Sequence, residues 1–138
     1  MFRLIDSPLG PLRLQASPRG LSRVEFTAAS APQEAVGGVE EGGIEKRSAD
    51  VLDAAQVQLA EYFAGQRRAF ELPLDPPATT DFRAAVHAQL VEIGYGETVT
   101  YRDVAKLLGR PGATRAVGSA CGANPLLIVR PCHRVLRS

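Results

Sequence analysis

The stretch TYRDVAKLLGRPGATRAVGSACG, residues 100–122, decides the fold of the C-terminal part of the chain. Thr100 followed by Asp103 is a capping-box pattern, and it predicts the start of a short helix that Gly109 ends. Three apolar residues of this helix are expected to face inward: Val104, Leu107 and Leu108.

A tight turn at Arg110-Pro111-Gly112 leads to a second predicted helix over residues 113–121, which consists mainly of small residues. Two short helices joined by a glycine-containing turn are typical of a helix-turn-helix unit. Arg115 is the one large side chain of this second helix. A smooth helix with a single arginine suits close approach to a narrow groove of DNA. A tightly packed core helix is the alternative, because Ala and Gly fit there equally well.

A longer helix is predicted upstream, with Thr80 or Asp81 as its N-cap and an end at Gly94-Tyr95-Gly96. Its apolar positions are Phe82, Val86, Leu90 and Ile93. His87 lies among them, and we expect it to be half-buried in a packing role. Downstream of the helix-turn-helix, the apolar run at residues 126–129 predicts a short buried strand.

The first 26 residues alternate between apolar and polar positions and contain two turns, Ser7-Pro8-Leu9-Gly10-Pro11 and Pro18-Arg19-Gly20. They predict a three-stranded antiparallel meander with strands at residues 2–6, 12–16 and 21–26. Residues 27–48, rich in Ala, Ser, Gly and Glu, are predicted to be a flexible connection.

From Asp50 to Gly65 the pattern becomes helical. The expected apolar stripe is Leu52, Ala55, Val57, Leu59 and Phe63. Residues 70–74 predict a short strand or extended piece that leads to Asp75-Pro76-Pro77, a predicted interdomain linker. The fold class is therefore an α/β N-terminal domain, residues 1–77, followed by a mainly α, winged-helix-like domain with a helix-turn-helix, residues 78–138.

The length leaves room for one compact domain or two very small ones, and the composition excludes a disordered or fibrous chain. The 138 residues are 45% hydrophobic and 22% charged, close to the globular average. No run approaches the ~18 apolar residues of a membrane span, and the start lacks a signal-peptide pattern, so we expect a cytoplasmic protein. Residues 1–81 have 8 Lys and Arg against 12 Asp and Glu, whereas residues 82–138 have 8 against 3. The basic C-terminal part suits phosphate binding, although an ordinary solvated surface would have the same composition.

Two cysteines, Cys121 and Cys132, are too few for a disulfide framework, so we expect thiols. Cys132 is followed by His133, and three arginines lie close in sequence: Arg130, Arg134 and Arg137. Positive charge favours a thiolate nucleophile, but adjacent residues of a helical turn do not face each other. His133 would therefore act through an unusual backbone path or a bridging water. An inert buried cysteine beside a surface histidine is the alternative.

Metal and protease sites are not supported by the spacing of these residues. Only Cys121, Cys132 and His133 could serve as soft ligands, and there is no paired CxxC, so we expect no metal. A papain-like dyad would require a different order of cysteine and histidine.

The string PCHRV at residues 131–135, preceded by Arg115-Ala116-Val117-Gly118 and Asn124-Pro125, closely resembles the O6-alkylguanine-DNA alkyltransferases. Other segments resemble that family in the same order: Ser7-Pro8-Leu9-Gly10, Glu61-Tyr62-Phe63-Ala64-Gly65, Thr80-Asp81-Phe82 and Tyr95-Gly96-Glu97-Thr98 with Tyr101.

The resemblance implies a protein that flips O6-alkylguanine out of duplex DNA and transfers the alkyl group irreversibly to Cys132. It implies that His133 takes the thiol proton through water, that Arg115 fills the vacated stack, and that Tyr101 presses on the target phosphate. Arg102 and Arg110 would contact the DNA backbone, while Asn124 and Val135 would belong to the substrate pocket. No cofactor is implied, and we expect a monomer whose partner is double-stranded DNA.

The sequence departs from the family pattern at three places. His87 stands where the family has tryptophan, and Arg130 stands where an apolar residue precedes the Pro-Cys pair. Family members also continue past PCHRV with a glycine-rich loop and a glutamate that orients the histidine, and we expect this truncated chain to lack both. Two alternatives therefore stay open: a non-catalytic DNA- or lesion-binding relative, and an inactive remnant.

Overall fold

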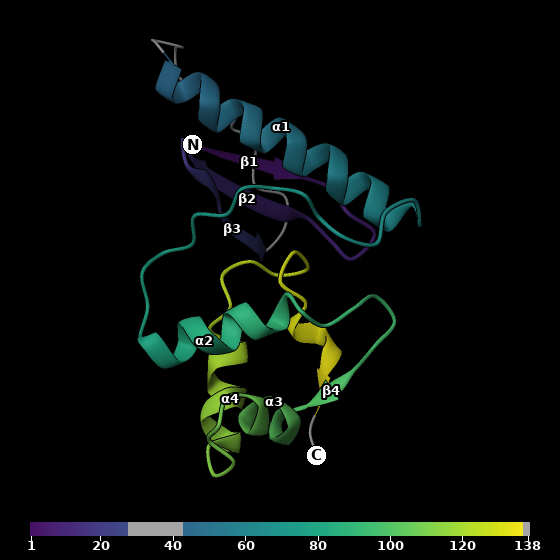
Figure 1. Ribbon diagram of the computed structural model, residues 1–138. Coiled ribbons are helices and arrows are strands. Elements are labelled where there is room, and N and C mark those ends of the chain that lie inside the picture. Colours follow the sequence, from purple (N-terminus) through teal and green to yellow (C-terminus); the bar gives the residue numbers. More distant parts are fainter. Residues whose placement is uncertain (28–42, 137–138) are drawn as a thin grey trace. The chain divides into compact units, whose positions relative to one another are not determined.

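The computed structural model describes residues 1–27 and 43–136 and divides into two compact units, Met1–Pro77 and Ala78–Ser138. In the described residues, the first unit contains a three-stranded sheet and one long helix, and the second contains three α-helices, a single 3-10 turn and a small two-stranded sheet (Figure 1). No helix in the described ranges is long and apolar enough to cross a membrane.

The predicted meander is confirmed in the first unit. Its antiparallel strands, in the order β1-β2-β3, are β1 (Phe2–Ile5), β2 (Leu12–Ser17) and β3 (Gly20–Phe26). In β2, Leu12, Leu14 and Ala16 are buried, and the residues between them are partly exposed. Successive side chains of a strand point to opposite faces, so this alternation gives the sheet one apolar face.

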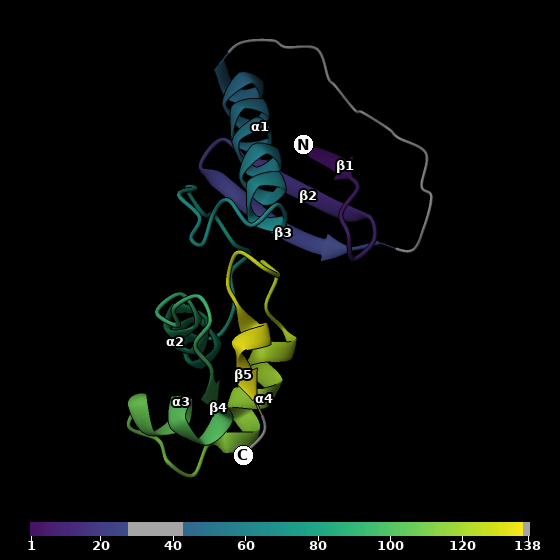
Figure 2. The same ribbon diagram turned by 90° about the vertical axis from the view of Figure 1, so that its right-hand side faces the viewer.

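Helix α1 (Gly43–Phe63) packs on that sheet, lying across one face of it in both views (Figures 1 and 2). It begins inside residues 27–48, which the sequence predicted to be a flexible connection, so that prediction is wrong from Gly43 onward. Residues 28–42 of the predicted connection lie outside the described ranges. Glu, Lys and Arg favour helix, and Lys46 pairs with Asp50 one turn later at 3.3 Å.

The predicted apolar stripe of α1 is correct except at Val57, which is 55% exposed. Leu52, Ala55 and Leu59 recur every three or four residues and are all fully buried. Val57 follows Ala55 by two residues, which rotates its side chain to the opposite side of the helix.

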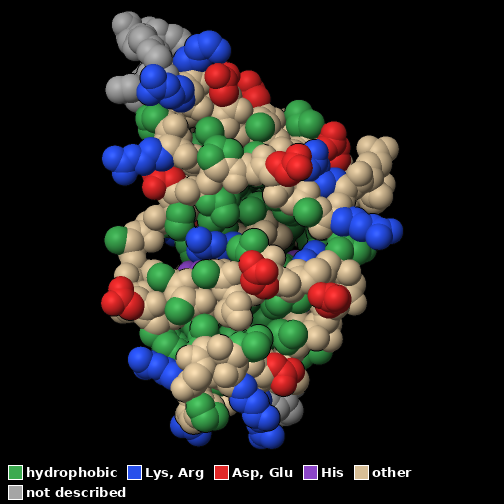
Figure 3. Space-filling view, viewed as in Figure 1, with side chains coloured by type: hydrophobic (Ala, Val, Ile, Leu, Met, Phe, Trp, Pro, Cys, Tyr) green, Lys and Arg blue, Asp and Glu red, His purple; other side chains and the backbone are tan. Residues whose placement is uncertain are grey.

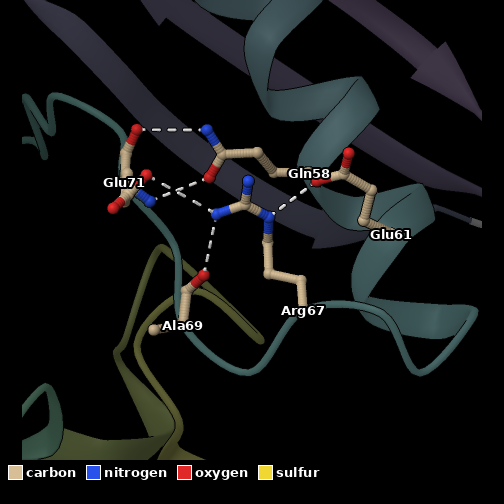
Figure 4. Close-up of polar contacts among 5 residues, drawn as sticks. All are labelled: Gln58, Glu61, Arg67, Ala69 and Glu71. Atoms are coloured by element: carbon tan, nitrogen blue, oxygen red, sulfur yellow. Dashed lines mark hydrogen bonds and ion pairs between the residues drawn. The ribbon is translucent and has the colours of Figure 1, made fainter.

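The segment after α1 returns along the helix and is held to it by polar contacts (Figure 4). Gln58 exchanges two hydrogen bonds with the backbone of Glu71, at 2.8 and 3.1 Å. Arg67 donates to the Glu61 carboxylate at 2.8 Å and to the Ala69 carbonyl at 3.1 Å. These bonds fix the course of the chain between the helix and the linker.

The described residues of the second unit form three α-helices: α2 (Asp81–Leu90), α3 (Tyr101–Leu107) and α4 (Thr114–Gly122). Thr80, one of the two predicted candidates, is the N-cap of α2, and its hydroxyl accepts a hydrogen bond from the Arg83 amide. A parallel pair of two-residue strands, β4 (Val99–Thr100) and β5 (Val135–Leu136), was not predicted. Runs of two residues are too short to show a periodic pattern.

Helices α3 and α4 form the predicted helix-turn-helix, with Gly109 at φ 74° in the connection. The Thr100–Asp103 capping box is present, with both hydrogen bonds at 3.0 Å. Leu107, predicted to face inward, is instead 66% exposed. Val104 and Ala105 of α3 are buried in the core of the second unit, and Leu108, the C-cap residue, packs against that core. Leu107 lies on the other side of the helix.

The predicted strand at residues 126–129 is wrong, because this apolar run forms a turn. The Arg130 amide donates to the Leu126 carbonyl at 2.9 Å, and Ile128 has a positive φ of 72°. Apolar residues bury equally well in a strand or a compact turn, so hydrophobicity alone did not separate the two.

The close approach of Gly20 to the segment after α1 predicts a sensitive site in the first unit. Leu21 pairs with Leu74 in an isolated parallel bridge, and a Cβ on Gly20 would lie 2.5 Å from the Pro73 carbonyl oxygen. We expect Gly20→Ala to lower the free energy of unfolding by about 1–3 kcal/mol, measured by urea denaturation, because backbone must shift. Gly112→Ala, where a Cβ meets nothing within 4 Å, is the control. Equal stability of the two variants would contradict this reading of the bridge.

Candidate active site and nucleic-acid interface

Cys132 begins a single 3-10 turn, η1 (Cys132–Arg134), and its side chain is partly exposed. The turn is held by the Arg130 carbonyl, which accepts from the Cys132 amide at 2.8 Å and from the Asn124 side-chain amide at 2.9 Å. The Asn124 oxygen accepts from the Leu126 amide at 3.0 Å. Asn124 therefore clamps both ends of the loop that delivers the cysteine.

His133 follows Cys132 on the same 3-10 turn. Within residues 1–27 and 43–136, neither side chain makes a hydrogen bond. Partial loss of solvent, and then the charge of Arg134, lower the pKa of His133. Because that pKa lies below the ordinary value of 6.5, the imidazole is mainly neutral at pH 7 and can accept a proton.

Arg134 anchors η1 to the loop after α2, a contact that the sequence did not suggest. Its guanidinium donates to the Ile93 carbonyl at 2.7 Å and lies 5.7 Å from the centre of the Tyr95 ring. In the sequence Arg134 was only one of several positive charges near Cys132. Its bonding partner is 41 residues away, so no local pattern indicated it.

The two cysteines differ in environment. Cys121, in the last turn of α4, is buried in the core of the second unit, and Cys132 packs against that core. Burial, followed by the electrostatic influence of Cys132, raises the pKa of Cys121 to about 11. At neutral pH Cys121 is therefore a protonated thiol and a poor nucleophile.

Tyr101 and Arg115 lie on the helix-turn-helix. Tyr101 is the first residue of α3, and its ring packs beside Gly118 of α4, where a Cβ would lie 3.4 Å from the ring. Arg115 is exposed in the first turn of α4. The small residues of α4 thus serve partly to admit the tyrosine ring, a role that their composition alone did not reveal.

Further cations surround this motif. Arg102 is exposed on α3, and Arg110 is exposed in the connection, with its guanidinium 5.6 Å from the centre of the Phe82 ring. Lys and Arg side chains gather at the end of the second unit where α3 and α4 lie (Figure 3). This end can attract phosphates by charge.

Two further residues, His87 and Val135, are more buried than a surface or pocket role would suggest. His87, expected to be half-buried, is 2% exposed, and its Nε2 lies 2.8 Å from the Ala120 carbonyl oxygen. Val135, expected in a substrate pocket, lies in the core and pairs with Val99.

Arg130 is the unusual charge beside the cysteine. Burial lowers its pKa. Its Nε is buried and, in the part of the chain that the structure describes, has no hydrogen-bond partner. In those same ranges no three His, Cys, Asp or Glu side chains are grouped as metal ligands.

Comparisons with known proteins agree with this geometry. Residues 1–76 match the model "6-O-methylguanine DNA methyltransferase, ribonuclease-like domain", and residues 81–138 match the DNA binding domain of the same family. A methylated-DNA--protein-cysteine methyltransferase of Methanosarcina barkeri is 39% identical, over 99% of this chain and 82% of that protein. One of Mycobacterium tuberculosis is 38% identical, over 98% of this chain and 77% of its own length.

A solved structure gives the same result. The crystal structure of Mycobacterium tuberculosis OGT in complex with DNA is similar with a TM-score of 0.80 and 36% identity, covering 99% of this chain and 78% of that one. Both family models together cover nearly all of the sequence, and the relatives match it across both units. On this evidence the chain belongs to the 6-O-methylguanine DNA methyltransferase family.

Proposed function

We propose that this protein repairs O6-alkylguanine in duplex DNA by irreversible transfer of the alkyl group to Cys132. The observation that carries the proposal is the Cys132 turn. A partly exposed thiol is held by the Asn124–Arg130 hydrogen bond in the same unit as a helix-turn-helix with exposed arginines. Relatives named methylated-DNA--protein-cysteine methyltransferase support the reaction, and the DNA complex of a relative supports the partner.

Binding is proposed to use the positive end of the second unit. Arg102 and Arg110 contact phosphates, which gives affinity without sequence preference. The reacting atom of a stacked guanine is out of reach, so the base must leave the stack. Arg115 then occupies the vacated position, and Tyr101, steadied by Gly118, presses on the phosphate of the flipped nucleotide.

The covalent step balances with the protein and the lesion alone. The thiol proton of Cys132 passes through a bridging water to His133, which is neutral at pH 7 because of its lowered pKa. The sulfur forms a bond to the alkyl carbon while the bond between that carbon and O6 breaks. The electron pair of the broken bond stays on guanine, which takes up the proton that the thiol released. The thioether product is stable, so each molecule acts once.

The proposal is tested by incubating the protein with duplex DNA that contains O6-methylguanine, followed by mass analysis of the Cys132 peptide. We expect one methyl group on Cys132 and none in Cys132→Ser, which should bind the same duplex with unchanged affinity. Binding of the methylated duplex by the wild type without any transfer would instead identify a non-catalytic DNA-binding relative.

Arg115→Ala should slow transfer from duplex DNA about tenfold or more, because the flipped state loses a group that offsets a few kcal/mol of unstacking. Transfer from free O6-benzylguanine, which needs no flipping, should change much less. Single-turnover rates on both substrates measure this difference, with Arg19→Ala, an exposed arginine of the first unit, as the control for lost charge. Equal losses on both substrates would remove Arg115 from the flipping step.

Iodoacetamide at pH 7 should label Cys132 well before Cys121, because Cys121 is buried and its pKa is raised to about 11. His133→Gln should slow the labelling of Cys132 if the imidazole accepts the thiol proton. Peptide mass spectrometry over time gives both rates. Faster labelling of Cys121 in the folded protein would mean that Cys132 is not the activated thiol.

A further inference from the structure

His87 is a buried titratable side chain that the proposed chemistry does not use. It lies on α2 with 2% of its surface exposed. Its Nε2 is 2.8 Å from the carbonyl oxygen of Ala120 on α4, and a carbonyl only accepts. The ring is therefore the Nε2–H tautomer when neutral, and it joins α2 to α4.

The carbonyl that His87 binds lies in the last turn of α4, where helix carbonyls lose their regular partners. The amide four residues later, that of Asn124, bonds instead to the Cys121 carbonyl at 3.2 Å. The Ala120 carbonyl accepts a shorter-range bond from the Ala123 amide at 3.1 Å, and that amide also bonds to the Ser119 carbonyl at 3.1 Å. His87 supplies a second donor and so fixes the place where the helix ends.

Hydrogen bonds connect the end of α4 to the turn that carries Cys132. Asn124 follows the end of α4, and its side-chain amide donates to the Arg130 carbonyl, which also accepts from the Cys132 amide. A shift of the last turn of α4 would move Asn124 and, through one shared carbonyl, the Cys132 turn.

The charges that face His87 oppose its protonation. Burial is the main cause of its lowered pKa, which the Ala120 hydrogen bond partly offsets. Arg130, from the cysteine loop, and Arg83, on α2, lower the pKa further. Cys121, on α4, is a neutral thiol at pH 7 and adds no charge. The buried Nε of Arg130 has no hydrogen-bond partner in residues 1–27 and 43–136. Protonation of His87 would add a second positive charge near Arg130, and this favours conformations in which the His87 ring leaves its buried position.

We propose that His87 is a positioning residue for Cys132: it holds the end of α4 from which Asn124 fixes the cysteine turn, and its protonation loosens that turn. The proposal rests on the proposed alkyl transfer for its biological meaning. It predicts a rate that falls in mild acid for a reason separate from His133.

Three variants test the proposal. His87→Leu removes the donor, His87→Gln keeps an N–H donor without titrating in this range, and Val91→Ala changes an exposed residue at the end of the same helix. We expect His87→Leu to slow methyl transfer about tenfold at pH 7.5, as loss of one buried hydrogen bond would, with DNA affinity unchanged. His87→Gln should restore most of the rate, and Val91→Ala should match the wild type.

The pH profile separates positioning from a merely structural role. Between about pH 7.5 and pH 5, the ratio of the His87→Gln rate to the wild-type rate should rise several-fold, because only the wild type adds a charge at this position. His133 titrates in both proteins, so its effect cancels in the ratio. In NMR, His87 should show the Nε2–H tautomer and should titrate at higher pH in Arg130→Met.

A constant ratio across this range, or a wild-type rate in folded His87→Leu, would overturn the proposal. If His87→Leu does not fold, the ratio and the NMR titration still decide. If the wild type transfers no methyl group at any pH, the proposed function fails. In that case the rate at which iodoacetamide labels Cys132 is measured instead of the methyl-transfer rate. Identical pH dependence of the labelling rate in the wild type and His87→Gln would overturn the positioning role.

Discussion

The carbonyl of Arg130 is the point on which the proposed chemistry depends. It accepts one hydrogen bond from the Cys132 amide and one from the buried side chain of Asn124. Ile128 in this loop has a positive φ of 72°, a conformation that costs free energy in a β-branched residue and persists where surrounding contacts hold it. The two bonds hold a short turn at a defined place against the core, so a partly exposed thiol is presented without the support of a long helix or strand.

Packing in the second unit transmits this constraint to the helix-turn-helix. Helix α4 contacts both α2 and α3, and it carries Arg115 near its start and leads into Asn124 at its end. The small residues between them allow close approach, most clearly at Gly118, which lies against the Tyr101 ring. One helix therefore connects the proposed DNA-binding face with the proposed nucleophile turn.

Burial and nearby positive charges determine the protonation states of the titratable groups near Cys132. Cys121 is kept protonated by burial, and His133 and His87 are kept neutral at pH 7 by lost solvent and nearby arginines. The surroundings thus favour a proton acceptor at His133 and suppress the competing thiol. Arg130 adds a partly buried charge, and its buried Nε has no hydrogen-bond partner in the described ranges.

The sequence by itself determined the meander, the capped helices and the helix-turn-helix, because alternation, capping boxes and turn residues act over a few positions. It also indicated Cys132 and the family through the PCHRV string. Only the tertiary structure decided that residues 126–129 turn rather than extend, that Leu107 faces outward, and that His87 and Arg134 bind carbonyls 33 and 41 residues away. Such contacts depend on how separate elements pack against each other. A local sequence pattern contains no information about a partner that lies far away in the sequence.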